Sequence, residues 1–201
     1  MARDRAARPE AKPLRLFVAV DVPDDVRGSI ADAIRPLRER FPRARWSPPA
    51  NWHLTVKFLG RAWPRTLDWI VASVEGVASV AHPFATSVAG LGAFPSARRA
   101  RVLWAGLEDP AGRLGAIAAS LDGAMAAEYE PEKRAFTPHL TVARFDPPVE
   151  VGPDLPGAST RPFEVDRLVL YRSHLRRPAP VYEPIALFPL GAGDTVFPAA
   201  P

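Results

Sequence analysis

The tetrapeptide His-Leu-Thr-Val occurs twice in this chain, at residues 53–56 and 139–142. Each copy predicts a β-strand, and side chains alternate between the two faces of a strand. The histidine and the threonine therefore share one face, while the leucine and the valine share the other. Two such strands can bury their apolar faces in a core and direct two imidazoles and two hydroxyls into one cleft.

The histidines outside the repeats do not suggest chemistry. The chain contains four histidines, at positions 53, 82, 139 and 174. His82 precedes a proline where a helix is expected to end, which favours an exposed side chain. His174 follows a strand in an arginine-rich turn, which favours a solvated loop. The plain alternative for the repeats is that both are ordinary strands whose histidines make only local contacts.

Composition limits the class of protein. A chain of 201 residues that is 47% apolar suits one domain, or two small lobes that share a core. The absence of cysteine excludes disulfides, a cysteine nucleophile and thiolate metal sites, and it fits the cytoplasm. The net charge of +4 favours an anionic partner such as RNA. No stretch is apolar enough to span a membrane. We expect a cytoplasmic monomer with no membrane association and no evident protein partner.

The order of the expected elements favours an α+β fold, because strands and helices do not alternate regularly. Hydrophobic periodicity and proline positions predict strands at 14–22, 45–59, 84–94, 100–107, 138–145, 163–172 and 181–190, and helices at 23–42, 64–80 and 110–129. The two repeats lie 139 − 53 = 86 residues apart, which predicts two pseudo-symmetric lobes. We expect one bilobal domain over 14–190, a flexible arm over 1–13 and a flexible tail over 191–201.

The paired histidines suit acid–base chemistry on a phosphate diester. Hydrolysis of a cyclic phosphate needs a base for water and an acid for the departing oxygen, on opposite sides of phosphorus. Imidazole has an unperturbed pKa of roughly 6.5, so it serves in either role near neutral pH. Each positioned acid or base contributes about 10²–10⁴-fold. The threonine hydroxyls can donate to the non-bridging oxygens as charge develops there.

Metal binding is the main alternative for two histidines. A catalytic zinc site usually has three protein ligands, often including a carboxylate. The sequence contains no HExxH motif, and the acid nearest to a repeat is Asp146. It also lacks a Walker-type loop and a GxGxxG motif. Metal-dependent and nucleotide-driven chemistry are therefore both disfavoured.

The segments around the repeats resemble a known family. From about Leu14 to Leu190 the chain is similar to the bacterial RNA 2′,3′-cyclic phosphodiesterases, also called 2′-5′ RNA ligases, which belong to the 2H phosphoesterases. The segments that carry this resemblance are RLFVAVDVP (15–23), PANWHLTVKFLG (49–60), GAFPSARRARVLWAG (92–106), FTPHLTVAR (136–144) and LVLYRSHL (168–175).

The resemblance implies a bilobal α+β fold in which antiparallel sheets form a central cleft and the helices pack outside. It implies hydrolysis of RNA 2′,3′-cyclic phosphate ends to 2′-phosphates without metal or cofactor, and reversible 2′-5′ RNA ligation that needs no ATP because the cyclic ester already stores the energy. By analogy, His53 is the proton donor and His139 the proton acceptor, Thr55 and Thr141 hold the phosphate, and Arg144 helps to bind the substrate.

Arg144 conflicts with simple strand geometry. Strict alternation puts its side chain on the apolar face of the second repeat, away from His139. A β-bulge or the end of the strand must turn it for the analogy to apply.

Several other residues have two interpretations. Arg98, Arg99 and Arg101 fit either RNA phosphates or a solvated hairpin tip. Phe17, Trp46 and Trp52 fit either core packing or base stacking. Two alternative functions also stay open: a 2H phosphoesterase that acts on a small cyclic nucleotide, and an RNA-binding module without chemistry.

Overall fold

The computed structural model describes residues 12–191 and 193–198. Its strands are β1 (Leu14–Asp21), β2 (Arg45–Trp46), β3 (His53–Ala62), β4 (Phe84–Thr86), β5 (Val88–Phe94), β6 (Ala100–Leu107), β7 (His139–Val149), β8 (Phe163–Val165), β9 (Arg167–His174) and β10 (Val181–Pro189). Its α-helices are α1 (Asp24–Ala33), α2 (Arg35–Arg40), α3 (Leu67–Val80) and α4 (Arg113–Ala124), and its 3₁₀ turns are η1 (Pro49–Asn51), η2 (Pro64–Thr66) and η3 (Ala97–Arg99).

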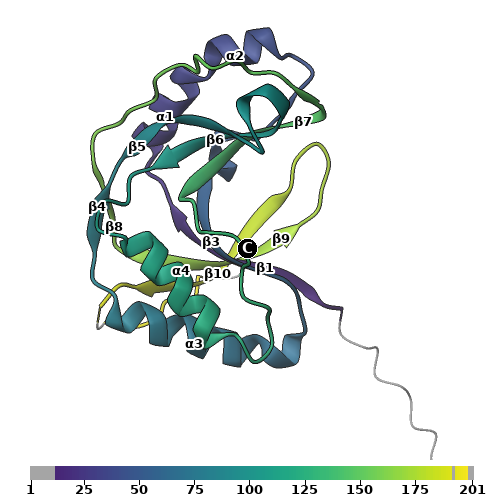
Figure 1. The fold of residues 1–201 in the computed structure, drawn as a ribbon. Helices are drawn as coiled ribbons and strands as arrows, with labels where there is room; N and C mark the ends of the chain where they lie inside the picture. The colour runs from purple at the N-terminus through teal and green to yellow at the C-terminus, as the bar shows by residue number, and fades with distance from the viewer. Residues whose placement is uncertain (1–11, 192, 199–201) are drawn as a thin grey trace, which may run out of the picture.

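One eight-stranded sheet forms the frame of the molecule. Its order is β10-β9-β1-β3-β7-β6-β5, with β2 also paired to β7, and neighbouring strands are antiparallel. Helices α3 and α4 contact each other and pack against the half that contains β3, β9 and β10, whereas α1 and α2 lie at the other end of the molecule (Figure 1). The expected α+β architecture is confirmed, with the two repeats on the central strands β3 and β7.

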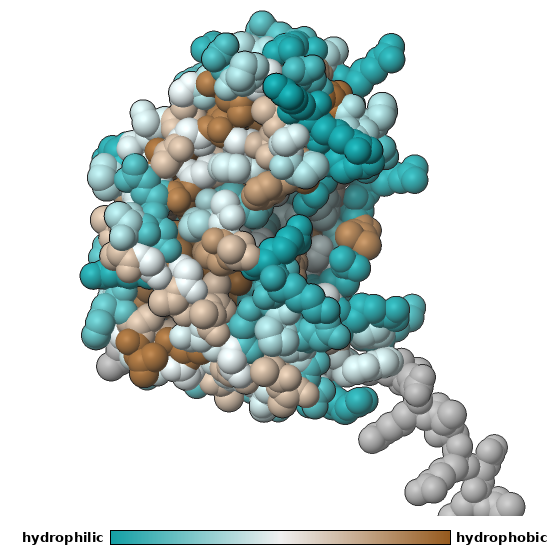
Figure 2. Space-filling view, viewed as in Figure 1, coloured by the Kyte–Doolittle hydropathy of each residue, from teal (hydrophilic) through white to brown (hydrophobic). Residues whose placement is uncertain are grey.

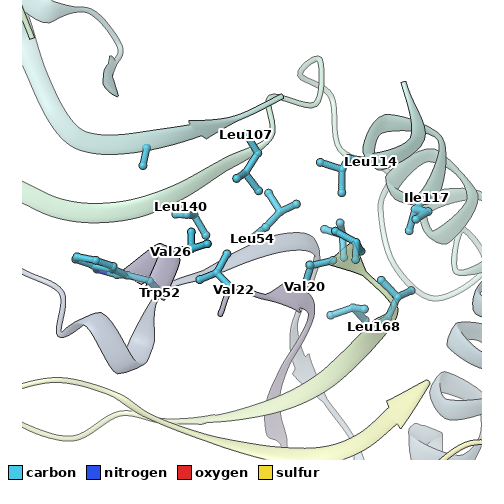
Figure 3. Close-up of a cluster of buried hydrophobic side chains, with 14 of the residues drawn as sticks. Val20, Val22, Val26, Trp52, Leu54, Leu107, Leu114, Ile117, Leu140 and Leu168 are labelled. Carbon is cyan, nitrogen blue, oxygen red and sulfur yellow. The ribbon is translucent and has the colours of Figure 1, made fainter. Parts of the chain in front are cut away.

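The core continues across the junction between the two halves of the sheet. Leu54 on β3 and Leu140 on β7 are both fully buried and lie close together in one apolar cluster (Figure 3). Neighbouring members of that cluster come from both halves and include Val20, Trp52 and Leu107. Trp52 is 1% exposed, so the core interpretation of this residue is confirmed.

Two expected helices differ in extent from those observed. The expected helix over 23–42 is divided at Ile34 into α1 and α2. Pro36 has no N–H to continue the helical hydrogen bonds, which accounts for the break. The helix expected over 110–129 begins only at Arg113 and ends at Ala124, and the Asp109 carboxylate accepts hydrogen bonds from the N–H groups of Leu114 (3.0 Å) and Gly115 (2.9 Å). This bond pattern satisfies first-turn donors that lack a helical partner.

The segments at the two ends are described in part. Residues 1–11, most of the expected flexible arm, lie outside the described residues, as do 192 and 199–201. Within the expected flexible tail, Val196 pairs with Leu187 on β10 through two backbone hydrogen bonds of 2.7 and 2.8 Å. Within the described ranges, no helix has the length and apolarity needed to cross a bilayer.

Candidate active site

The two repeats begin the two central strands and face the same way. His53 is the first residue of β3 and His139 the first residue of β7, and Leu54 pairs with Leu140 in the antiparallel register. Extending that register puts each histidine across from the threonine of the other repeat. His53, Thr55, His139 and Thr141 all line one cleft of about 560 Å³. The geometry that the alternation of side chains predicted is therefore present.

A β-bulge in β7 turns Arg144 into this cleft. Trp104 on β6 pairs with Thr141, but the next residue back, Leu103, pairs with Ala143, so β7 carries one extra residue at Val142. Such an insertion interrupts the alternation of faces. Val142 and Ala143 are consequently both buried, and Arg144 lines the cleft beside the two repeats. Strict alternation alone gives the wrong face for Arg144, and the bulge is the physical reason.

Strand β3 contains the same bulge at the equivalent position. Ala19 on β1 pairs with Thr55, and Val18 pairs with Lys57, so Val56 is the extra residue. Phe58 then lines the cleft, with 69% of its surface exposed. It follows His53 by five residues, as Arg144 follows His139. The sequence analysis missed Phe58, although this shared offset was a signal that could have identified it.

The bulge in β3 also buries a lysine on the face away from the cleft. Lys57 is 5% exposed, and its ammonium forms an ion pair with Asp122 near the end of α4. The same ammonium donates to the backbone carbonyl of Glu130 at 3.1 Å. These bonds tie the segment that leads from α4 toward His139 to the strand that carries His53.

Both histidine rings are anchored by the backbone of the residue two positions earlier. The Nδ1 atom of His139 lies 2.7 Å from the carbonyl oxygen of Thr137, and the Asn51 backbone hydrogen-bonds His53. A carbonyl only accepts, so neutral His139 carries its proton on Nδ1 and leaves Nε2 free. The Asn51 side chain also donates to the Pro180 carbonyl at 2.8 Å, in the loop between β9 and β10. Asn51 is a second residue that the sequence analysis missed.

Aromatic rings enclose His53 more fully than His139. Phe17 stacks on His53 with ring centroids 4.7 Å apart, and the Tyr182 ring meets His53 edge-on at 5.0 Å. Phe94 meets His139 edge-on at 5.1 Å. Phe17 is 4% exposed, so it packs in the interior, as its core interpretation predicts, while its ring also borders the cleft.

Burial lowers the pKa of both histidines. Burial brings the pKa of His53 to about 4. The hydrogen bond to the Asn51 backbone raises this pKa, and the positive charge of Arg27 lowers it further. Burial also lowers the pKa of His139; the Thr137 bond opposes this and the charge of Arg144 adds to it. Both rings are therefore neutral at pH 7 in the free protein, and an anion in the cleft would raise both pKa values.

These shifts give a testable pH dependence of stability. The pKa of His53 is about 4 in the folded state, against an ordinary value of 6.5, so the unfolded chain binds more protons between these two values. The contribution of neutral His53 to the free energy of unfolding is therefore fully present above pH 6.5 and is lost as the pH falls toward 4. At about 1.4 kcal/mol per pKa unit, and because the ring borders an open cleft, we expect this loss to be at most about 3 kcal/mol. Denaturant unfolding at about pH 7 and about pH 4.5 should show a smaller loss for His53→Gln than for wild type; equal losses would contradict the shift.

The remaining predicted residues lie outside the cleft or at its edge. His82 is exposed just after α3, as expected. The predicted solvated loop at His174 is wrong. This residue is half-buried at the end of β9, and its Nε2 lies 2.6 Å from the Glu183 carboxylate. Trp46 borders the cleft and donates to the Phe41 carbonyl at 3.1 Å. The three arginines of the η3 hairpin do not line the cleft: Arg98, Arg99 and Arg101.

The donor set of the site is imidazole, hydroxyl and guanidinium. Within residues 12–191 and 193–198, no three side chains of His, Cys, Asp or Glu come together in a geometry that could hold a metal ion.

Hydrophilic side chains gather on the side of the molecule where the β9–β10 loop projects, at the right of the view (Figure 2). The fold and the paired repeats define a phosphoesterase of the two-histidine class.

Comparison with known proteins gives the family. The model described as "LigT like Phosphoesterase" matches residues 20–104 and 106–182. The chain belongs to this LigT-like phosphoesterase family.

Relatives agree with this assignment over most of the chain. An RNA 2′,3′-cyclic phosphodiesterase from Thermus thermophilus is 33% identical over 186 residues, which cover 88% of this chain and 90% of the relative. One from Geobacillus stearothermophilus is 31% identical over 186 residues, which cover 89% of this chain but 58% of the longer relative. Solved structures of a Thermus thermophilus protein (TM-score 0.72) and of E. coli LigT complexed with NADP+ (TM-score 0.74) are each 27% identical. They cover 90% of this chain, and 100% and 99% of their own chains.

Proposed function

We propose that this protein hydrolyses RNA 2′,3′-cyclic phosphate ends to 2′-phosphates by metal-independent catalysis with two histidines. The observation that carries the proposal is the single cleft in which His53 and His139, from separate halves of the sheet, share a face with two threonine hydroxyls. The printed names of the relatives, RNA 2′,3′-cyclic phosphodiesterase, supply the substrate class.

In the proposed reaction, His139 removes a proton from water through Nε2 as the water oxygen attacks phosphorus. The bond from phosphorus to the ribose 3′ oxygen breaks, and His53 donates a proton to that oxygen. The phosphate remains on the 2′ oxygen, so the product is a 2′-phosphate. The same steps with an RNA 5′-hydroxyl in place of water give a 2′-5′ linkage without ATP, because the cyclic ester already stores the energy for the new bond.

The acid must be charged at the moment of transfer, although burial lowers the pKa of His53 in the free protein to about 4. The negative charge of a bound phosphodiester favours the protonated imidazole and raises that pKa. Thr55 and Thr141 are positioned to donate to the non-bridging oxygens, and Arg144 adds a fixed positive charge at one end of the cleft. These groups stabilise the charge that develops on phosphorus oxygens in the transition state.

Arg144→Gln is expected to raise the pKa of His139, because the Arg144 charge is one of the causes that lower it. The base would then require a higher pH, and substrate binding would weaken. We expect the acid limb of the pH profile of kcat/KM to move to higher pH. We also expect KM to rise by about tenfold, which is the usual contribution of one hydrogen bond to a charged group. Arg144→Lys keeps the charge and should leave the acid limb in place. An unchanged profile in Arg144→Gln would exclude this role.

The decisive experiment is to incubate the protein, in the presence of a chelator, with an oligonucleotide that ends in a 2′,3′-cyclic phosphate and to identify the position of the product phosphate. A 2′-phosphate supports the proposal, with the exposed His82→Ala variant as an active control. Turnover of mononucleotide cyclic phosphates alone would identify a small-nucleotide phosphoesterase. Binding without product would identify an RNA-binding module, and activity lost in the chelator would indicate a metal.

The proposal includes a setting for the reaction. We infer that the protein works as a monomer in the cytoplasm, because both histidines come from one chain and the sequence contains no cysteine. Its partner is RNA that carries a cyclic phosphate end. Mass measurement in solution, with and without such an RNA, tests the oligomeric state.

A further inference from the structure

The segment that leads into the second repeat is held mainly at its two ends. Residues 125–138 join α4 to β7 and contain neither helix nor strand. At the far end, the carbonyl of Pro138 accepts a hydrogen bond of 3.0 Å from the N–H of Leu107 on β6. Residues 131–135, between the ends, are exposed. The direction of the Thr137 carbonyl therefore depends on how the near end of the segment is fixed.

A buried ion pair fixes that near end. Lys57 on β3 is paired with Asp122 on α4, and the Lys57 ammonium also donates to the Glu130 carbonyl at 3.1 Å. The second carboxylate oxygen of Asp122 accepts a hydrogen bond of 3.0 Å from the N–H of Glu132. One carbonyl and one N–H of the segment are thereby bonded to side chains on a strand and a helix.

Stability alone does not account for this pair. Among residues 12–191 and 193–198, Lys57 is the one buried residue with a charged side chain, at 5% exposed. Desolvation of a buried ion pair costs several kcal/mol per ion, and an apolar pair of similar volume is often as stabilising or more so. What an apolar pair cannot supply is the set of hydrogen bonds that gives the segment before His139 one conformation.

That conformation determines which nitrogen of His139 can act as a base. The Thr137 carbonyl lies 2.7 Å from Nδ1 of His139 and can only accept a hydrogen bond. It keeps the proton on Nδ1 and leaves the lone pair of Nε2 free. Without that acceptor the proton is shared between the two nitrogens. A ring that carries the proton on Nε2 has no lone pair there to take a proton from water.

The other histidine is anchored independently of the ion pair. The ring of His53 is hydrogen-bonded to the backbone of Asn51 in the turn η1, and the Asn51 side chain is bonded to the Pro180 carbonyl. Trp52, between the turn and the ring, is fully buried. Loss of the ion pair should therefore disturb one histidine and spare the other, although Lys57 lies on the strand that His53 begins.

We propose that the Lys57–Asp122 ion pair positions the catalytic base. It fixes the segment that carries Thr137 and so holds His139 in the tautomer that can accept a proton. Lys57 and Asp122 lie outside the cleft, so they are positioning residues that act through His139. The inference rests on the proposed function for the role of His139 as the base.

The test replaces both charges by apolar side chains in the double variant Lys57→Met/Asp122→Leu. We expect its free energy of unfolding to stay near wild type, because an apolar pair can replace a buried ion pair and the freed backbone groups belong to exposed residues. We expect kcat for an RNA 2′,3′-cyclic phosphate to fall by about 10–100-fold, since a small misplacement of a catalytic group costs up to about 10²-fold. KM should change little, because the threonines that hold the phosphate are untouched.

Two further variants complete the series. Lys133→Met is the matched control, because this lysine lies in the same segment but is 85% exposed, and it should behave as wild type. Asp122→Asn tests the inference even if the double variant does not fold. An amide has one oxygen where the carboxylate has two, so either Lys57 or the N–H of Glu132 loses its acceptor. We expect a smaller loss of kcat in Asp122→Asn than in the double variant.

Nitrogen-15 NMR of the imidazole rings reads the tautomers without turnover. At a pH where both rings are neutral, wild type should carry the His139 proton on Nδ1. The double variant should show a mixture of the two tautomers at His139, and Asp122→Asn should show a smaller change in the same direction. The signals of His53 should be the same in all variants, and Lys133→Met should match wild type at both rings.

The two readouts separate this inference from the proposed function. If wild type turns over no cyclic phosphate, the proposed function fails, and a tautomer change confined to His139 still supports the positioning role. The inference is overturned if wild-type His139 carries its proton on Nε2, or if removal of the ion pair leaves the His139 tautomer unchanged. In an active enzyme, wild-type kcat in the folded double variant would also overturn it.

Discussion

Replacing either His53 or His139 by alanine is expected to lower kcat for an RNA cyclic phosphate by at least about 10²–10⁴-fold, the usual weight of one positioned acid or base. Each ring lines the cleft from a separate half of the sheet, so neither can substitute for the other. Without His139 no group takes the proton from water, and without His53 the ribose oxygen departs unprotonated. Single-turnover kinetics at saturating substrate measures this effect on the chemical step.

The double alanine variant should lose little beyond the worse single variant, because residues that act as one unit have non-additive effects. Circular dichroism and thermal unfolding check that the fold persists. His82→Ala should match wild type, since His82 is exposed and outside the cleft. Full activity in either single variant would contradict two-histidine catalysis.

Leu140→Ala is expected to lower the free energy of unfolding by about 3–5 kcal/mol, the range for a buried leucine whose surroundings cannot collapse. Leu140 is fully buried and pairs with Leu54, also fully buried, where β3 meets β7. Several strands converge on this point, so we expect the cavity to persist. Urea unfolding followed by tryptophan fluorescence measures the change.

Leu175→Ala provides the matched control, because Leu175 is 71% exposed at the edge of the cleft. Its effect on the free energy of unfolding should stay within about 0.5 kcal/mol, as for most surface substitutions. A loss below about 1 kcal/mol in Leu140→Ala would mean that the junction repacks, contrary to the close packing expected of a core.

The repeats could be interpreted from sequence because a strand face depends on local alternation. Leu54 and Leu140 are buried while His53 and His139 border the cleft, as the two-residue period predicts. The strand order that brings the repeats together could not follow from alternation, since pairing between distant strands is a tertiary choice. The separation of the repeats by about half the chain and the family resemblance supplied that part of the prediction.

The parts that could not be predicted depend on register between strands. The bulge that turns Arg144 into the cleft arises from how β7 pairs with β6, and β7 itself shows no glycine or proline at that point. Asn51 is hidden for a similar reason: its partner Pro180 is 129 residues away in the chain. The bond between His174 and Glu183 forms only when β9 and β10 pair. The sequence alone does not show that pairing, so it favours a solvated loop for His174.

The extra residue at Val142 makes the length of β7 a functional property. Deletion of that one residue would allow β7 to pair regularly with β6, and every later side chain would keep its face, because the bulge is lost together with its extra residue. A one-residue insertion after Thr141 that leaves the bulge in place would instead turn the guanidinium of Arg144 toward the interior although its codon was untouched. Deletion of Val142 should therefore be tolerated far better than such an insertion.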